Sequence, residues 1–163
     1  MIMGVAGCTG QPARDTPRPS AEPAVPNRPK IAPMVIHSST AVRWSTDYDS
    51  QTRQALQTGQ RRLVVSITAF NPPAEPTPLV VRLLTAKSLE LREIDRFSVH
   101  PHAAFKAENG VEPQRFLISL ASVAELLDES EVQLEIGFDS SNGEVRDGRA
   151  ELTVEIVDAP NPP

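Results

Sequence analysis

From Met34 onward, hydrophobic and polar residues alternate along much of the chain with the period of two that is typical of half-buried β-strands. The clearest stretch, residues 131–138, places Val, Leu, Ile and Phe on one face and acidic or amide residues on the other. Residues 150–156 repeat this pattern. We expect both stretches to be strands whose polar face is exposed and keeps the sheet soluble. The acidic residues expected on these exposed faces are Glu131, Glu135, Glu151 and Glu155.

Turn-forming residues separate these two stretches. Ser-Asn-Gly at 141–143 and Asp-Gly at 147–148 tolerate the positive φ angles that turns require. We therefore expect the two strands to pair as an antiparallel hairpin with a long loop.

Similar but shorter patterns predict further strands along the same part of the chain. The connector at 71–78 holds four prolines, which lack the N–H of a ladder hydrogen bond and so exclude a central strand there. Two helical turns are expected, one over 50–57 that ends at Gly59, and one over 122–127 that begins with a capping box of Ser122 and Glu125. The further strands are expected over residues 34–38, 42–44, 62–70, 79–84 and 115–120, with short edge strands over 89–94 and 97–99.

This succession of about seven to nine short strands predicts an all-β fold, an immunoglobulin-like or transthyretin-like antiparallel β-sandwich. A domain of this size buries enough surface to form a core without a metal or a disulfide. The chain has a single cysteine, so no internal disulfide is possible. Architecture of this kind does not by itself indicate a function.

Proline and charge divide the chain at about the same place. Of the 16 prolines, seven lie within residues 12–33. Such a segment buries too little apolar surface to fold, so it predicts a disordered, extended tether. Residues 1–33 carry four basic and two acidic groups, and because the whole chain carries −5, the remainder carries −7. An acidic domain binds phosphates poorly, so we expect no nucleic-acid partner.

The first residues carry a motif. Val5-Ala6-Gly7-Cys8 resembles the lipobox of bacterial lipoproteins, in which an aliphatic residue and two small residues precede the cysteine that is acylated. The resemblance implies lipid attachment at Cys8, a membrane partner through that anchor, and a place in the cell envelope. Because Thr9 rather than aspartate follows, it implies the outer membrane, with the protein facing the periplasm.

The residues before Cys8 leave two explanations open. A secretory signal has a basic region and ~7–15 apolar residues, whereas seven residues precede Cys8 here and none is basic. Either the true start lies upstream of Met1 and the signal is truncated, or Cys8 is a free cysteine of a cytoplasmic protein. On the lipoprotein reading, the expected segments are a signal remnant at 1–8, a disordered tether at 9–33, a β-sandwich at 34–158 and a disordered tail at 159–163.

His100-Pro101-His102 is the local arrangement best suited to a metal, because residues i and i+2 of a strand point the same way. Asp95 or Glu108 would add a carboxylate. A stable site needs three or four ligands, so an exposed loop with two surface histidines is the simpler expectation, and we expect no metal. Asp47-Tyr48-Asp49-Ser50 lacks the glycine and glutamate of a calcium loop, and we expect a solvated turn there.

Catalytic motifs are missing from the sequence. No Gly-x-Ser-x-Gly elbow is present, and Cys8 is far in sequence from any histidine. We therefore expect a non-enzymatic protein without a cofactor: a lipid-anchored envelope protein whose β-sandwich mediates protein–protein interaction. The alternative is a soluble accessory domain that binds a small ligand or carbohydrate through the loops at 140–148 and 103–113.

One segment suggests a narrower version of the first hypothesis. Phe70-Asn71-Pro72-Pro73, followed by Thr77 through Leu83, is similar to a segment of the small outer-membrane lipoprotein of type VI secretion systems. In that family a strand, an Asn-Pro turn and a Pro-(Leu/Val)-Val-Val-Arg strand recur in a transthyretin-like sandwich. The resemblance implies a partner in a secretion membrane complex, to which that family docks.

Overall fold

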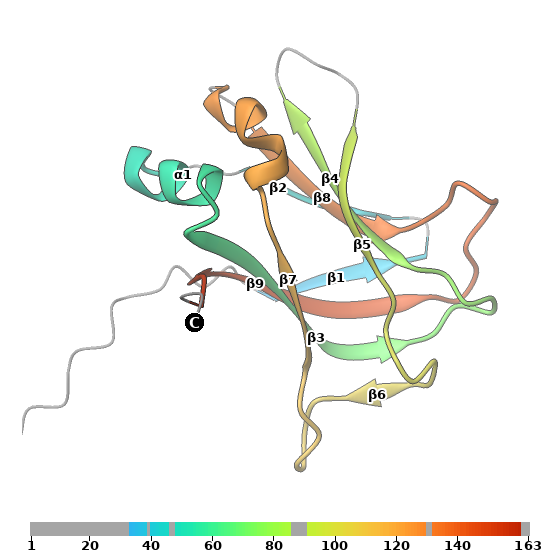
Figure 1. Cartoon of the computed structure of the whole chain (residues 1–163). Helices are drawn as coiled ribbons and strands as arrows, with labels where there is room; N and C mark the ends of the chain where they lie inside the picture. The colour runs from blue at the N-terminus through green and yellow to red at the C-terminus, as the bar shows by residue number, and fades with distance from the viewer. Residues whose placement is uncertain (1–32, 39, 46–47, 86–90, 130–131, 161–163) are drawn as a thin grey trace, which may run out of the picture.

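The computed structural model describes residues 33–160, except 39, 46–47, 86–90 and 130–131. The described part folds into two antiparallel β-sheets packed face to face (Figure 1), which confirms the predicted all-β sandwich. The expectations for Cys8, the tether and the last three residues lie outside the described residues. The strands are β1 (Met34–His37), β2 (Val42–Ser45), β3 (Arg61–Asn71), β4 (Leu79–Thr85), β5 (Arg92–Phe97), β6 (Phe105–Lys106), β7 (Gln114–Ile118), β8 (Val132–Phe138) and β9 (Arg149–Asp158).

The order of the strands shows that the chain crosses repeatedly between the sheets. One sheet has the order β1-β9-β3, and the free side of β3 pairs with β7 and then with β6. The other sheet has the order β2-β8-β4-β5. The connections from β3 to β4 and from β8 to β9 therefore pass from one sheet to the other.

This topology corrects the expected hairpin of β8 and β9. β8 lies between β2 and β4, whereas β9 lies between β1 and β3 in the opposite sheet. The backbone N–H of Asp139 donates to the carbonyl of Pro78 at 2.9 Å, so the chain leaves β8 beside the start of β4. The alternating pattern decides only which face of each strand is buried. A hairpin within one sheet and a connection between two sheets both satisfy this pattern.

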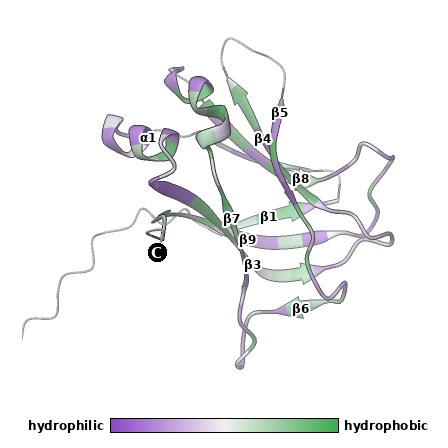
Figure 2. Cartoon of the chain, viewed as in Figure 1, coloured by the Kyte–Doolittle hydropathy of each residue, from purple (hydrophilic) through white to green (hydrophobic). Residues whose placement is uncertain are grey.

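The inner faces of the sheets form the core. Every hydrophobic residue predicted to point inward from β8 and β9 is buried, and the register places Leu134 opposite Leu83 and Leu63 opposite Ile156. Figure 2 shows hydrophobic and hydrophilic segments alternating along the strands. Phe97 of β5 stacks on Phe116 of β7 with ring centroids 4.1 Å apart, which joins the two sheets on the side of the sandwich opposite β1 and β2.

Two helices cover one end of the sandwich (Figure 1). Helix α1 (Ser50–Gln57) has the predicted bounds. Its N-cap is Asp49, whose carboxylate accepts hydrogen bonds from the backbone N–H and the hydroxyl of Thr52, at 2.7 and 3.0 Å. None of the described helices is long and apolar enough to cross a membrane.

The second helical segment differs from its prediction. It is a 3-10 helix, η1 (Ala121–Asp128), whose N-cap is Leu120 and which has no side-chain cap. The expected capping box is therefore wrong: Ser122 lies inside the helix, and Glu125 pairs with Arg92 at 2.9 Å instead. The backbone of Val123 departs from helical angles, which breaks the regular turn that a capping box needs.

Candidate functional site

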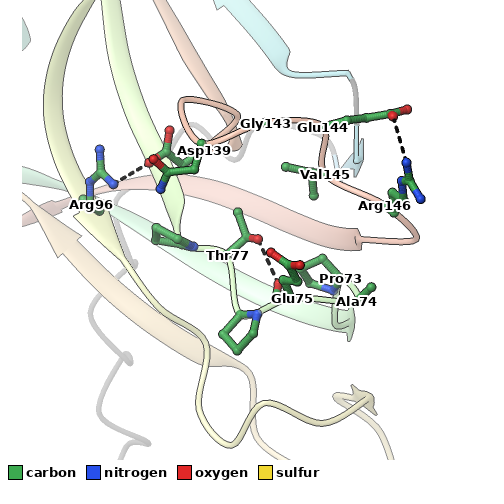
Figure 3. Close-up of a pocket in the computed structure, with 13 residues that line it drawn as sticks. Pro73, Ala74, Glu75, Thr77, Arg96, Asp139, Gly143, Glu144, Val145 and Arg146 are labelled. Atoms are coloured by element: carbon green, nitrogen blue, oxygen red, sulfur yellow. Dashed lines mark hydrogen bonds and ion pairs between the residues drawn. The ribbon is translucent and has the colours of Figure 1, made fainter.

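A cavity of about 570 Å³ (Figure 3) opens at the end of the sandwich opposite the helices (Figure 1). It lies between the β3–β4 connector, residues 72–78, and the β8–β9 loop, residues 139–148. We call these two segments the loop end. Arg96 of β5 and Asp139 also line the cavity.

The two segments of the loop end are fixed to each other. The backbone N–H of Ala74 donates to the carbonyl of Arg146 at 3.1 Å, and the Asn71 side-chain amide donates to the carbonyl of Asp147 at 2.9 Å. Proline limits the remaining freedom of the connector because its φ angle is locked. Gly148 permits the close approach, since a Cβ there would lie 3.2 Å from the Cβ of Pro73 in the connector.

Asp139 is a buried charge at the edge of the cavity. Its side chain is only 2% exposed, and its carboxylate accepts hydrogen bonds from Arg96 and from the backbone N–H of Ser141. Arg82 lies farther away, at 3.9 Å. Hydrogen bonds from the Ser141 backbone and hydroxyl, followed by the bond from Arg96, hold the pKa of Asp139 below its usual range. The carboxylate is therefore ionised at neutral pH.

A row of alternating charges continues from this point across the outer face of the second sheet. The register places Arg43, Glu135, Arg82 and Glu93 side by side on β2, β8, β4 and β5. Glu135 accepts hydrogen bonds from Arg43 at 2.6 Å and from Arg82 at 3.3 Å. Glu93 in turn binds Arg96 through two hydrogen bonds of 3.0 Å. We call these four residues the charge row; it ends beside the cavity.

The charge row corrects the expectation for the acidic faces. Glu135 points outward as predicted, yet it is only 4% exposed because it lies between the two arginines. Glu151 and Glu155 are half-buried, and Glu151 pairs with Arg149 at 2.6 Å. Glu131 lies outside the described residues. Of these acids, Glu135 is held in a structural ion-pair network rather than in free solution.

The two candidate metal ligands lie in the bend between β5 and β6. His100 and His102 are both exposed; the ring of His102 packs edge-on against Phe70, with centroids 6.4 Å apart. The expected extra ligands are engaged elsewhere, since Asp95 accepts from a backbone N–H and Glu108 pairs with Lys106. Over the described ranges, no group of three or more His, Cys, Asp or Glu is arranged to hold a metal.

The suggested calcium segment has a structural role. Asp49 caps helix α1, and its pKa is held below its usual value chiefly by hydrogen bonds from Thr52, first the backbone N–H and then the side chain. Ser50 is the first residue of the helix. Asp47 lies outside the described residues.

One of the two loops that were expected to bind a small ligand lies at this cavity. The loop at 140–148 does line a cavity, but the other wall is the proline connector rather than residues 103–113. Sequence reasoning missed Arg96, Asp139 and Glu75 as residues of one site. The stiff connector was the only feature of the sequence that pointed to this site. Arg96 and Asp139 are 43 residues apart in the sequence, so their pairing could not be predicted from a local pattern.

Comparison with known proteins adds little to this geometry. No family model matches the sequence, and no curated protein matches it. One solved structure, the core of the NLP protein from Drosophila, aligns over 81% of this chain and 99% of that chain, at 15% identity and a TM-score of 0.28. That structure was described for pentamer formation and histone binding. A likeness at this TM-score carries no argument about the present chain.

Proposed function

We propose that this chain is a non-enzymatic, lipid-anchored protein of the bacterial cell envelope whose β-sandwich binds another protein through the loop end. The observation that carries the proposal is the rigid, open cavity between the β3–β4 connector and the β8–β9 loop. A surface that is already ordered loses little conformational entropy on binding, which favours recognition.

The direction of β1 supports this placement of the partner. β1 pairs antiparallel with β9 so that His37 lies opposite Arg149, next to the loop end, and Met34 lies opposite Leu152, farther from it. β1 therefore begins away from the loop end and runs toward it. A disordered tether between Cys8 and Met34 would leave the loop end accessible to a partner.

The lipid anchor is tested by metabolic labelling. The gene, together with the genomic DNA upstream of the codon for Met1, is expressed in its own bacterial host in the presence of labelled palmitate. We expect label in the wild-type protein and none in the Cys8→Ser variant. Equal labelling of the two proteins, or none in either, would overturn the anchored part of the proposal.

Docking at the loop end is tested separately by photo-crosslinking in cells. A photoreactive amino acid is placed at Thr77 in the connector, and at Gln54, an exposed position of α1 at the opposite end. We expect one dominant adduct from position 77, identified by mass spectrometry as an envelope protein, and no such adduct from position 54. The same adducts from both positions, or no adduct from either, would count against the loop end.

The resemblance to the type VI secretion lipoprotein gives a second, narrower candidate. The similar segment forms the end of β3, the connector and the start of β4, and thus one wall of the cavity. On this candidate the partner is a protein of the secretion membrane complex. A gene deletion should then abolish secretion, with rescue by the wild-type gene and not by Cys8→Ser; normal secretion without the gene would exclude it.

A further inference from the structure

One carboxylate in the cavity lacks a counter-charge. At one end of the cavity Arg96 pairs with Asp139 and with Glu93. At the other end Arg146 lies 3.7 Å from Glu144. Between these two ion pairs lies Glu75, whose carboxylate forms no hydrogen bond or ion pair with any residue that the structure describes. Figure 3 shows this carboxylate on the side of the connector that faces the β8–β9 loop.

The walls around Glu75 suit a long aliphatic side chain. Pro73, Pro76 and Pro78 contribute rigid apolar rings on one side, and Val145 lies on the other. The Thr77 hydroxyl already donates to the carbonyl of Glu75 at 2.8 Å, so its oxygen is left to accept a further hydrogen bond. The cavity thus combines a few apolar side chains, within a lining that is polar over most of its area, with two acceptors, the Glu75 carboxylate and the Thr77 oxygen.

Lysine and arginine match this combination. Their methylene stems pack along apolar surface while the charged head stays at a polar site. A guanidinium or ammonium group donates several hydrogen bonds and accepts none, so it fits acceptors and not donors. The net charge of −7 on residues 34–163 also attracts basic segments at long range.

We propose that this cavity is a recognition pocket for one lysine or arginine side chain on an exposed peptide segment of the partner. The proposal rests on the proposed docking function and names the chemistry that the partner presents. Glu75 is the residue that binds the positive charge, and the proline rings orient the stem. Glu75 repels a carboxylate-bearing ligand, and the two arginines that line the cavity, Arg96 and Arg146, each lie near a carboxylate of the protein itself.

The test is an NMR titration of the full chain with three capped pentapeptides. Each is Gly-Ser-X-Ser-Gly, where X is arginine, its neutral analogue citrulline, or glutamate. We expect the arginine peptide to cause saturable shifts of the Ala74, Thr77 and Val145 amide signals. The citrulline peptide should bind about five-fold more weakly, the upper range for an exposed ion pair, and the glutamate peptide should not bind there. Equal binding of arginine and citrulline peptides, or no saturable shift, would overturn the pocket.

Variants at Glu75 separate charge recognition from a general structural effect. Glu75→Gln should raise the Kd of the arginine peptide about five-fold, and Glu112→Gln, at an exposed position that does not line the cavity, should leave it unchanged. Glu75→Lys should reverse the preference and bind the glutamate peptide. Unaltered arginine binding by Glu75→Gln and Glu75→Lys would refute the assignment.

The pocket and the proposed function can fail independently. If the crosslink from position 77 persists at full yield in Glu75→Gln, docking at the loop end holds and the basic-side-chain pocket is wrong. If the arginine peptide binds as expected but position 77 yields no adduct in cells, the pocket does bind a basic side chain, and the proposed docking function is wrong.

Discussion

Arg82 and Glu135 form an ion pair across β4 and β8, with Arg82 Nη1 3.3 Å from Glu135 Oε1. The Glu135 side chain is 5% exposed, although it lies on the outer face of the sheet. A carboxylate that is withdrawn from water loses its hydration, and this cost is offset only by well-placed cations and donors. Arg43 and Arg82 therefore compensate the charge of Glu135 on this face, and the opposite face of the two strands packs into the core.

Removing one partner of this pair should destabilise the fold. In Arg82→Met the buried carboxylate keeps only Arg43, so we expect the free energy of unfolding to fall by about 2–3 kcal/mol. Urea unfolding at neutral pH measures the change. The control is Arg92→Met, whose pair with Glu125 is exposed on both sides and should contribute less than about 1 kcal/mol. Similar losses in both variants would contradict the role of burial.

Asp139 should make the stability of the protein depend on pH. Its pKa in the folded state lies below the ordinary value of 3.8, chiefly through hydrogen bonds from Ser141 and then through Arg96. A lowered pKa means that the ionised group stabilises the fold above the ordinary pKa. This contribution is lost as the pH falls through the folded-state pKa.

Urea midpoints measured from neutral pH down to about pH 2 should therefore decrease below about pH 4. The Asp139→Asn variant should start from a lower midpoint at neutral pH and should show a shallower decrease, because asparagine does not titrate. A wild-type slope in this variant would show that other carboxylates carry the effect.

Replacing Gly137 even by alanine should destabilise the fold. A Cβ at this position of β8 would lie 2.8 Å from the Cβ of Ala41, just before β2. Because such overpacking displaces backbone, we expect Gly137→Ala to cost about 1–3 kcal/mol in thermal or urea unfolding. Adding Ala41→Gly removes the nearest atom and should restore part of this stability. A double variant no more stable than Gly137→Ala would point to another cause.

The stacked rings of Phe97 and Phe116 should be energetically coupled. Their planes are inclined by only 20°, and each ring comes from a different sheet. A double-mutant cycle with leucine at both positions should give a coupling of about 0.5–1.5 kcal/mol. Leu117 is exposed on the same strand as Phe116, and Leu117→Ala combined with Phe97→Leu should be additive within about 0.5 kcal/mol.

The sequence pattern correctly predicted which face of each strand is buried, but it did not predict which strands pair with each other. Alternation placed Leu134 and Leu152 in the core, because a period of two decides which side of a strand is buried. It did not identify the strand beside each one, and the turn residues at 141–143 and 147–148 suit an arch between sheets as well as a hairpin. Only the tertiary pairing of β8 with β4, and of β9 with β3, distinguishes the two.

The cavity and the charge row could not be predicted for the same reason: they depend on contacts between residues far apart in the sequence. Glu135 is polar and lies on the predicted polar face. It is nevertheless buried by Arg43 and Arg82, which precede it by 92 and 53 residues in the sequence. The cavity likewise joins the connector to a loop about 70 residues later. The stiffness of the connector could be predicted from its four prolines, because proline acts locally.

The position of β9 has a consequence for how the chain folds during synthesis. β9 is the last of the described strands, yet it lies between β1 and β3, pairing Leu152 with both Met34 and Ile67. Because the chain emerges from the ribosome N-terminus first, β1 and β3 are made before β9, the strand that pairs with both of them. Long-range pairing of this kind also folds slowly. Until β9 has emerged from the ribosome, the strand between β1 and β3 is missing and the core cannot close.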